Sequence, residues 1–163
     1  MEATSETGRI QTFLQQDHRE IDEIFMALRR EIRMVTDGRP FLVESLRSQF
    51  QMFDKRLERH IHWEEDLLFP AVEETRPDLK EGPGYVMRLE HEDIRRLKAS
   101  ANQRLSNPEP KVEALKSAAS DLEEMFSILK DHNMKEEHVY YPMADELFSA
   151  SKTGELMKRF RAS

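Results

Sequence analysis

The sequence predicts an all-α protein, an antiparallel up-down four-helix bundle with a short additional helix at its C-terminal end. Three observations predict it: few helix breakers, long stretches of helix-forming residues between them, and apolar residues at steps of three and four. The 163 residues include only 5 Gly and 7 Pro. Between these breakers lie the uninterrupted stretches 9–37, 41–69, 85–107 and 111–141. Each is rich in Leu, Glu, Lys, Arg, Met and Gln, which favour helices.

Each stretch carries an apolar stripe. Steps of three and four residues keep side chains on one face of a helix, so every stretch predicts one amphipathic helix. Four such helices can bury their stripes against one another in a bundle. A chain of this length accommodates one domain, residues 1–163. The stripes run from Leu14 to Val35, from Leu46 to Leu67, from Met87 to Leu105, and from Leu115 to Val139.

Turn signals separate the stretches. Residues 37–40 (DGRP) and 107–110 (NPEP) combine a helix stop with a helix start. The middle connection, near residues 71–83, is longer. Pro70 and Pro142 are expected to end or kink the helices they follow. Residues 151–163 are expected to form the short C-terminal helix through Leu156 and Phe160.

Composition excludes several classes of protein. The chain has no Cys, which excludes disulfide scaffolds, zinc fingers, Cys-ligated iron–sulfur clusters and thiol catalysis. A net charge of −7, with basic residues scattered among the acids, argues against a nucleic-acid partner. No run of about 18 apolar residues predicts a membrane span. The N-terminal sequence MEATSETGRI lacks the features of a signal peptide, so we expect a cytoplasmic protein.

Histidines interrupt all four apolar stripes. They lie at His18, His60, His91 and His132, and on two stripes a glutamate follows four residues later, at Glu64 and Glu136. Counted from the predicted turns, all six residues lie near one depth of the bundle interior. Burying an unpaired carboxylate costs several kcal/mol, so such groups become neutral, form pairs or bind metal. The alternative to a metal site is a buried hydrogen-bonded network.

An internal repeat favours the metal site. The pattern H-x-x-x-E-E-x-x-x-[F/Y]-P occurs at residues 60–70 and again at 132–142, and [D/E]-H-x-x-I occurs at 17–21 and 90–94. The chain therefore reads as a duplicated helical hairpin, and two equivalent half-sites imply two metal ions with shared carboxylates. Nitrogen and oxygen donors suit iron, manganese or zinc. A ferritin-type site needs Glu-x-x-His, but Leu67 and Val139 follow the two glutamates.

The chain resembles the hemerythrin-like (HHE cation-binding) family over roughly residues 10–148. The resemblance rests on DHREI at 17–21, HIHWEEDLLFP at 60–70, EHEDIRRL at 90–97 and HNMKEEHVYYP at 132–142. It implies a four-helix bundle that holds a non-haem di-iron centre. It further implies the following ligands: His18 and His60 on one iron, His91 and His132 on the other, and Glu64 and Glu136 as bridging carboxylates.

One position departs from the oxygen-carrying members of the family. They place a further histidine four residues before the third-helix histidine, where this chain has Met87, a poor iron ligand. The iron near His91 and His132 is therefore expected to lack one protein ligand. The remaining candidates are expected to lie off the interior face or to pack at the end of the bundle: His62 and His138 at the surface, Glu65, Glu90 and Glu137 exposed, and Trp63, Tyr140 and Tyr141 in packing.

We expect a metal-binding protein rather than an enzyme, and no catalytic residue is assigned. Its partner would be a small molecule such as O2, NO or peroxide, or the iron itself, which it would bind or sense. The enzymatic alternative is an iron-donating repair protein for iron–sulfur or di-iron centres, or a peroxidase. The structural alternative is an interaction bundle in which the buried His and Glu residues form only a polar network. No protein partner is indicated.

Overall fold

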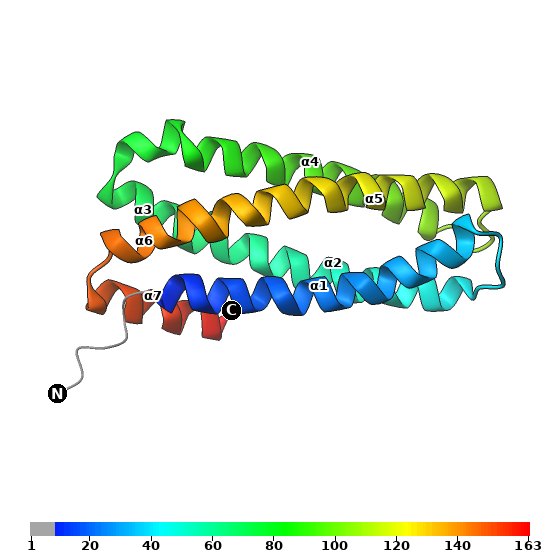
Figure 1. Ribbon diagram of the computed structural model, residues 1–163, viewed down its shortest axis with the longest axis horizontal. Helices are drawn as coiled ribbons and strands as arrows, with labels where there is room; N and C mark the ends of the chain where they lie inside the picture. The colour runs from blue at the N-terminus through cyan, green and yellow to red at the C-terminus, as the bar shows by residue number, and fades with distance from the viewer. Residues whose placement is uncertain (1–8) are drawn as a thin grey trace.

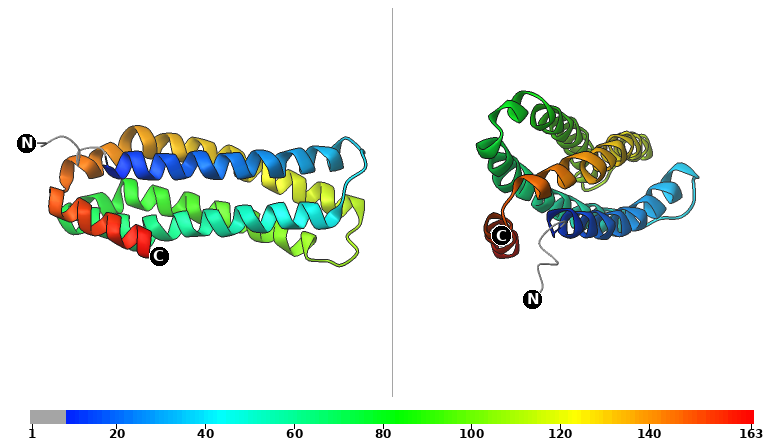
Figure 2. Two further views of the ribbon diagram at one scale, coloured as in Figure 1. Left: turned by 90° about the horizontal axis from the view of Figure 1, so that it is seen from below. Right: turned by 60° about the vertical axis from the view of Figure 1, so that its left-hand side comes forward.

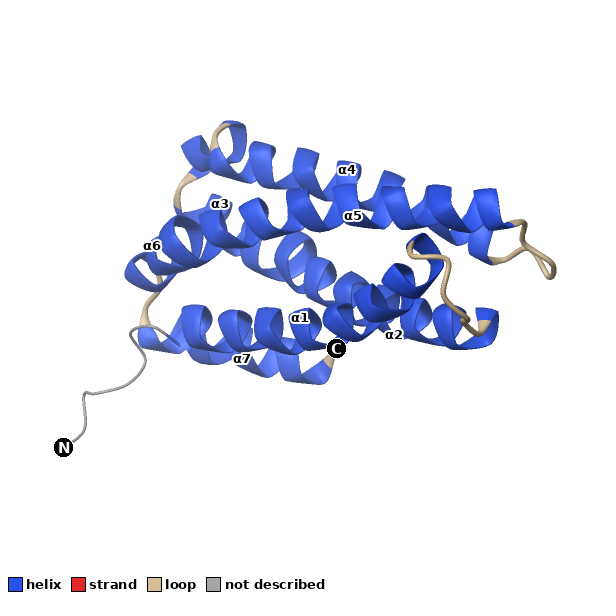
Figure 3. Cartoon of the chain, turned by 45° about the vertical axis from the view of Figure 1, so that its right-hand side comes forward, coloured by secondary structure: helices blue, strands red, loops and turns tan. Residues whose placement is uncertain are grey.

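The computed structural model describes residues 9–163, and every regular element within this range is helical (Figure 3). The all-helical class is therefore confirmed. Residues 1–8, which carry most of the segment that we expect not to be a signal peptide, lie outside the described residues. In the described part of the chain, no helix is both long enough and apolar enough to cross a membrane.

Four long helices account for most of the chain, and short elements join them at one end. The elements, in chain order, are α1 (Arg9–Thr36), α2 (Val43–His62), the π-helical turn η1 (Trp63–Leu68), α3 (Phe69–Thr75), the 3-10 turn η2 (Pro77–Glu81), α4 (Pro83–Leu105), α5 (Val112–Lys135), the π-helical turn η3 (Glu136–Tyr140), α6 (Tyr141–Leu147) and α7 (Ala150–Ala162).

The long helices lie alongside one another as two hairpins. α1 packs against α2, and α4 packs against α5. The two hairpins meet where α1 contacts α5 and where α2 contacts α4 (Figures 1 and 2). The short helices α3, α6 and α7 gather at the end where the two hairpins are joined, on the left of Figure 1. Each long helix therefore presents its apolar stripe to two neighbours.

Two apolar clusters fill the interior, and a polar layer separates them. On α1, Leu14 belongs to the cluster at the joined end, whereas Ile21 belongs to the larger cluster. The same change occurs between Met87 and Ile94 on α4. The stripe position between Leu14 and Ile21 is His18, and the one between Met87 and Ile94 is His91. The predicted depth of the histidines therefore coincides with the boundary between the two clusters.

The C-terminal helix predicted from Leu156 and Phe160 is α7, and both residues are fully buried. Phe160 stacks on Phe13 of α1, with 5.5 Å between ring centroids. Ser149 caps the first turn of α7 by accepting a hydrogen bond from the backbone of Lys152. α7 thus covers the joined end of the molecule rather than extending away from it.

Gly38 ends α1 with a left-handed backbone, φ +67°. The amide of Gly38 donates a hydrogen bond to the carbonyl oxygen of Val35 at 3.2 Å, and the amide of Arg39 donates one to that of Met34 at 2.9 Å. This is the Schellman arrangement. This turn directs α2 back along α1.

We expect Gly38→Ala to destabilise the protein by about 1 kcal/mol, because a Cβ is unfavourable in the left-handed region. Gly154 is the matched control: it lies within helix α7, and nothing lies within 4 Å of an added Cβ. Gly154→Ala should stabilise the protein by up to about 1 kcal/mol. Thermal or urea unfolding would measure both changes, and equal effects of the two substitutions would contradict this account of the turn.

Candidate metal centre

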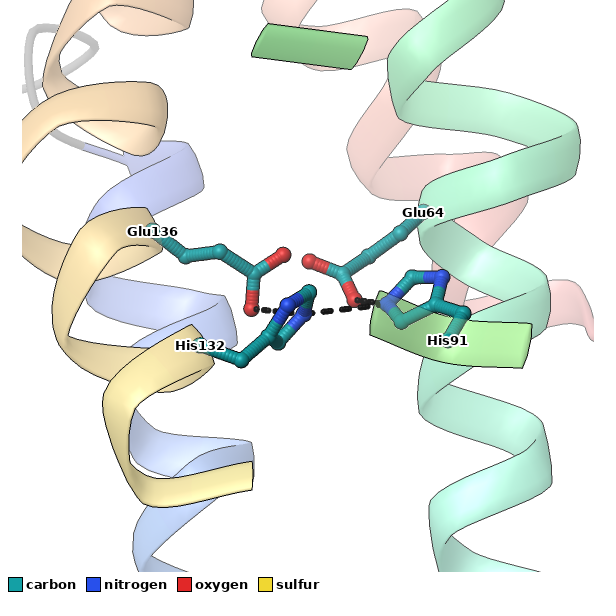
Figure 4. A group of neighbouring side chains, drawn as sticks. All are labelled: Glu64, His91, His132 and Glu136. Atoms are coloured by element: carbon teal, nitrogen blue, oxygen red, sulfur yellow. Dashed lines mark hydrogen bonds and ion pairs between the residues drawn. The ribbon is translucent and has the colours of Figure 1, made fainter. Parts of the chain in front are cut away.

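The six residues singled out by the sequence lie together inside the molecule. Each of the four histidines comes from a different long helix, and both glutamates lie in the π-helical turns that follow α2 and α5. All six are buried, with at most 3% of any residue exposed. Figure 4 shows four of them, whose side chains point toward one another from α4, α5 and the two turns. The six residues of the cluster are His18, His60, Glu64, His91, His132 and Glu136.

Their donor atoms form two groups that share Glu136. One group contains Glu64, His91, His132 and Glu136, and the other contains His18, His60 and Glu136; within each group the donor atoms lie within 4.8 Å of one another.

The carboxylates stand between the histidine pairs. Glu136 Oε1 lies 3.4 Å from His18 Nε2 and 3.2 Å from His132 Nε2. Glu64 Oε1 lies 3.4 Å from His60 Nε2 and 3.3 Å from His91 Nε2. Each glutamate therefore faces one histidine of each pair, which is the placement that a bridging carboxylate requires.

Three carboxylate oxygens in this cluster have no hydrogen-bond partner: Glu64 Oε1 and both oxygens of Glu136. Buried polar atoms are almost always satisfied, and an unsatisfied buried anion is costly. A cation held by these oxygens and the facing imidazole nitrogens would satisfy them. The donor set of histidine nitrogen and carboxylate oxygen suits iron, manganese or zinc. The residues present therefore fit a metal centre.

A carboxylate accepts a hydrogen bond from the outer nitrogen, Nδ1, of every histidine in the cluster. Such a partner fixes the ring so that Nε2 faces the interior, and it makes the imidazole a stronger ligand. The four pairs and their distances are His60 to Asp17 at 2.8 Å, His132 to Glu90 at 2.6 Å, His91 to Glu65 at 2.8 Å and His18 to Glu137 at 3.4 Å.

These contacts correct the expectation that Glu65, Glu90 and Glu137 are exposed. Each is only half-buried, but its carboxylate reaches from one helix to the histidine of a neighbouring helix. The expectation treated each helix alone, and a side chain at the edge of the interior face can still contact the next helix. The repeat held the missed signal, because an acidic residue precedes His18 and His91 and a second glutamate follows Glu64 and Glu136.

A second correction concerns Tyr141 and Val139. The fourth stripe was expected to end in Val139, which is 61% exposed, whereas Tyr141 is fully buried with its hydroxyl in the cluster. The π-helical turn η3 explains the change: the amide of Tyr141 donates to the carbonyl oxygen of Glu136, five residues earlier. Adding one residue to the turn moves every later side chain around the helix.

The prolines at the two repeats begin helices rather than end them. Pro70 and Pro142 lie in the first turns of α3 and α6, directly after the π-helical turns. A proline in a regular helix interior would clash with the carbonyl four residues earlier, and the widened turn accommodates it. Pro70 and Pro142 therefore follow a local widening of the helix, and the chain continues in helical form beyond them.

Two histidines and one methionine remain to be placed. His62 and His138 are exposed, as expected, and His62 pairs with Asp66 at 2.5 Å. Met87 is buried in the apolar cluster at the joined end, together with Phe69. Among the described residues, no further nitrogen or carboxylate donor joins the His91 and His132 group beyond the two glutamates.

The profile of the hemerythrin HHE cation binding domain matches residues 9–144. The chain belongs to this family. The matched range includes all four long helices, both π-helical turns and all six residues of the cluster, and it ends within α6.

Several curated relatives of this HHE domain carry the name iron-sulfur cluster repair protein YtfE. Those of Citrobacter koseri, Escherichia coli O157:H7 and Shigella boydii serotype 18 are each 28% identical to it over 131 residues. The similarity covers 78% of this chain and 59% of each relative, so the chain spans about three fifths of their length. No solved structure matches the chain at a significant level.

Charge in the HHE cluster is balanced between imidazole and carboxylate. Burial by itself lowers the pKa of His60, but the charge of Glu64 and the hydrogen bond to Asp17 raise it to about 10. Burial likewise lowers the pKa of His132, and Glu136 outweighs it to give about 10. Burial opposes ionisation of Glu64, yet the charge of His60 holds its pKa well below the usual range. Without metal, protons on the histidines therefore neutralise the carboxylates.

We expect Asp17→Asn to weaken metal binding to the HHE domain by about 10–100-fold, the usual cost of losing a carboxylate that orients a ligand histidine. Asp17 Oδ2 accepts from His60, and Oδ1 accepts from Arg56 at 3.0 Å. Glu20 also binds Arg56, at 2.7 Å, and among the contacts of the described residues it has none with a histidine. Glu20→Gln is therefore the matched control. Competition with a chelator would measure both affinities, and equal losses would contradict the role of Asp17.

Proposed function

We propose that this HHE domain holds a non-haem di-iron centre, with two histidines on each iron and two glutamates between the irons. The observation that carries the proposal is the set of three buried carboxylate oxygens without hydrogen-bond partners, two of which, Glu64 Oε1 and Glu136 Oε1, face four imidazole nitrogens. Iron bound there would supply a redox change and exchangeable coordination positions. The proposed ligands are His18 and His60, His91 and His132, and the bridging Glu64 and Glu136.

The proposal includes the arrangement of the helices and the place of the domain in the cell. Helix contacts within and between the two hairpins support an antiparallel up-down four-helix bundle. A single domain over residues 1–163 remains a prediction from the sequence. A cytoplasmic location, with neither nucleic acid nor membrane as a partner, remains a prediction from the sequence.

The chain's own residues prepare the site for metal. Carboxylates on the outer side of each ring hold the Nδ1 proton, which leaves Nε2 as the donor atom facing the interior. Apolar clusters above and below the polar layer keep bulk water away from the donors. Both features favour a centre that binds a small molecule such as O2, NO or peroxide, or that senses iron. Met87 offers no nitrogen or oxygen donor, so the iron near His91 and His132 would keep a coordination position for that molecule.

Anaerobic loading with ferrous iron, followed by metal analysis and an absorption spectrum after exposure to air, would test the proposal. We expect about two iron ions per chain and a change in the visible spectrum on oxidation. Manganese and zinc, which the same donors suit, would be loaded in parallel. Fewer than about one ion of any metal per chain would reject the site.

The names of the curated relatives favour a second candidate function, the donation of iron to damaged iron–sulfur proteins. Loaded protein would be mixed with an iron–sulfur protein from which the cluster has been removed, with sulfide supplied. Recovery of the cluster faster than with the same amount of free iron would support iron donation. Recovery no faster than with free iron would leave the binding or sensing function as the better proposal.

His60→Ala separates a metal centre from a purely structural polar network. If the centre binds iron, this variant should lose iron, because His60 Nε2 faces both Glu64 and Tyr141. His62→Ala is the matched control, since His62 lies two residues away but is exposed. Retention of all bound metal by the His60 variant would support the structural network.

A further inference from the structure

Tyr141 places its hydroxyl directly between the His18 and His60 side chains. Its oxygen lies 3.1 Å from His18 Nε2 and 3.2 Å from His60 Nε2, and it donates to Glu64 Oε2 at 2.7 Å. The residue is fully buried. The oxygen therefore faces the same two nitrogens that would hold one of the metal ions.

Around the Tyr141 hydroxyl, acceptors outnumber donor protons when the His18 and His60 rings are neutral. In that state, the Nδ1 protons of His60 and His18 are given to Asp17 and Glu137, so both Nε2 atoms are acceptors. Glu64 Oε2 is a third acceptor, but a phenol carries only one proton. A cation bound by the two nitrogens, the phenol oxygen and the Glu64 carboxylate would satisfy all of these groups at once.

The duplicated half of the site provides an internal comparison. Phe69 follows Glu64 by five residues, as Tyr141 follows Glu136, and each donates its amide to the carbonyl of that glutamate across a π-helical turn. Phe69 stacks on His91, with ring centroids 5.9 Å apart and planes 11° apart. The two halves therefore present an aromatic ring at the same place, but only one ring carries an oxygen.

We propose that Tyr141 is a ligand of the iron held by His18 and His60, bound through its phenolate oxygen. The inference rests on the proposed di-iron centre and adds a ligand to one side of it. On binding ferric iron, the phenol O–H bond breaks, the oxygen bonds to the metal, and the proton is released to solvent. The iron held by His91 and His132 has only Phe69 at the equivalent position, so the exchangeable coordination position is assigned to that iron.

The test compares the ferric-loaded protein with its Tyr141→Phe and Tyr140→Phe variants. Tyr140 is a matched control, because it is also buried but its hydroxyl has no hydrogen-bond partner among the described residues. Iron per chain, the visible phenolate-to-iron charge-transfer band and tyrosine ring modes in resonance Raman spectra are the readouts. We expect the original protein and the Tyr140 variant to show the band, and the Tyr141 variant to lose it while it still binds iron.

The outcomes separate this inference from the proposed function. An iron-loaded original protein without a phenolate band overturns the ligand role of Tyr141 and leaves the di-iron centre intact. A band that survives in a folded, iron-loaded Tyr141→Phe variant also overturns it. A protein that binds no iron overturns the proposed function, and the inference with it.

Discussion

Glu136→Gln is expected to remove both metal ions, because the Glu136 carboxylate is shared by the two groups of donor atoms. Its Oε1 stands between His18 and His132, at 3.4 and 3.2 Å from their Nε2 atoms. A glutamine keeps the shape of the side chain but supplies neither the negative charge nor a second oxygen. Loss of a residue that merely orients a ligand costs about 10–100-fold in affinity, so loss of the shared ligand should cost at least about 100-fold.

Metal analysis after anaerobic ferrous loading would measure this loss, and circular dichroism would show that the variant is folded. Glu124→Gln is the matched control, because Glu124 is an exposed glutamate on α5, the helix that leads into Glu136. The control should load as the original protein does. Full loading of the Glu136 variant would show that the ions are held by other residues.

The metal-free protein is expected to be most stable between about pH 4.5 and 6.5 and to lose stability in alkali. The folded-state pKa of His60 and of His132 is about 10, against the usual 6.5. Their contribution is therefore complete below pH 6.5 and is lost as the pH rises toward 10, on the order of a few kcal/mol for each histidine. The lowered pKa of Glu64 acts oppositely: its contribution is complete above 4.5 and is lost in acid.

Iron should reverse the alkaline part of this profile. A histidine must lose its proton to bind metal, so binding releases protons and becomes stronger as the pH rises. The difference in Tm between the ferrous-loaded and the metal-free protein should be larger at about pH 8.5 than at about pH 6. Anaerobic thermal scans at the two pH values would measure it. Iron retained unchanged down to about pH 4, well below the usual histidine pKa, would contradict histidine ligation.

Periodicity was enough to predict the helices, and the positions of the predicted turns placed the six polar residues near one depth. The steps of three and four hold along each long helix, so a residue such as His91 could be assigned to the interior without coordinates. The exceptions on otherwise apolar stripes were the signal for the centre. Periodicity describes one regular helix at a time, so it misses irregular turns and contacts between helices.

Two features were missed for different physical reasons. The π-helical turn at Glu136 inserts one residue, which turns Val139 outward and Tyr141 inward, and a fixed period of 3.6 residues cannot represent that insertion. The contacts of Glu65 and Glu90 depend on the neighbouring helix, whose rotation the sequence of one helix does not contain. A proline six residues after Glu64 and after Glu136 is a usable signal for the widened turn. The paired acidic residues of the repeat are a usable signal for the contacts between carboxylates and histidines.

The distribution of the donors over all four long helices has a further consequence for the unfolded chain. His18, His60, His91 and His132 are separated by long loops of sequence, and a chain without cysteine has no covalent cross-link to restrict those loops. In the proposed function, one pair of ions ties all four helices at a single level. The ions would thus serve as a reversible staple, in the way that disulfides do in secreted proteins. Folding and metal supply would then be linked, because the folded state would be less stable without iron than with it.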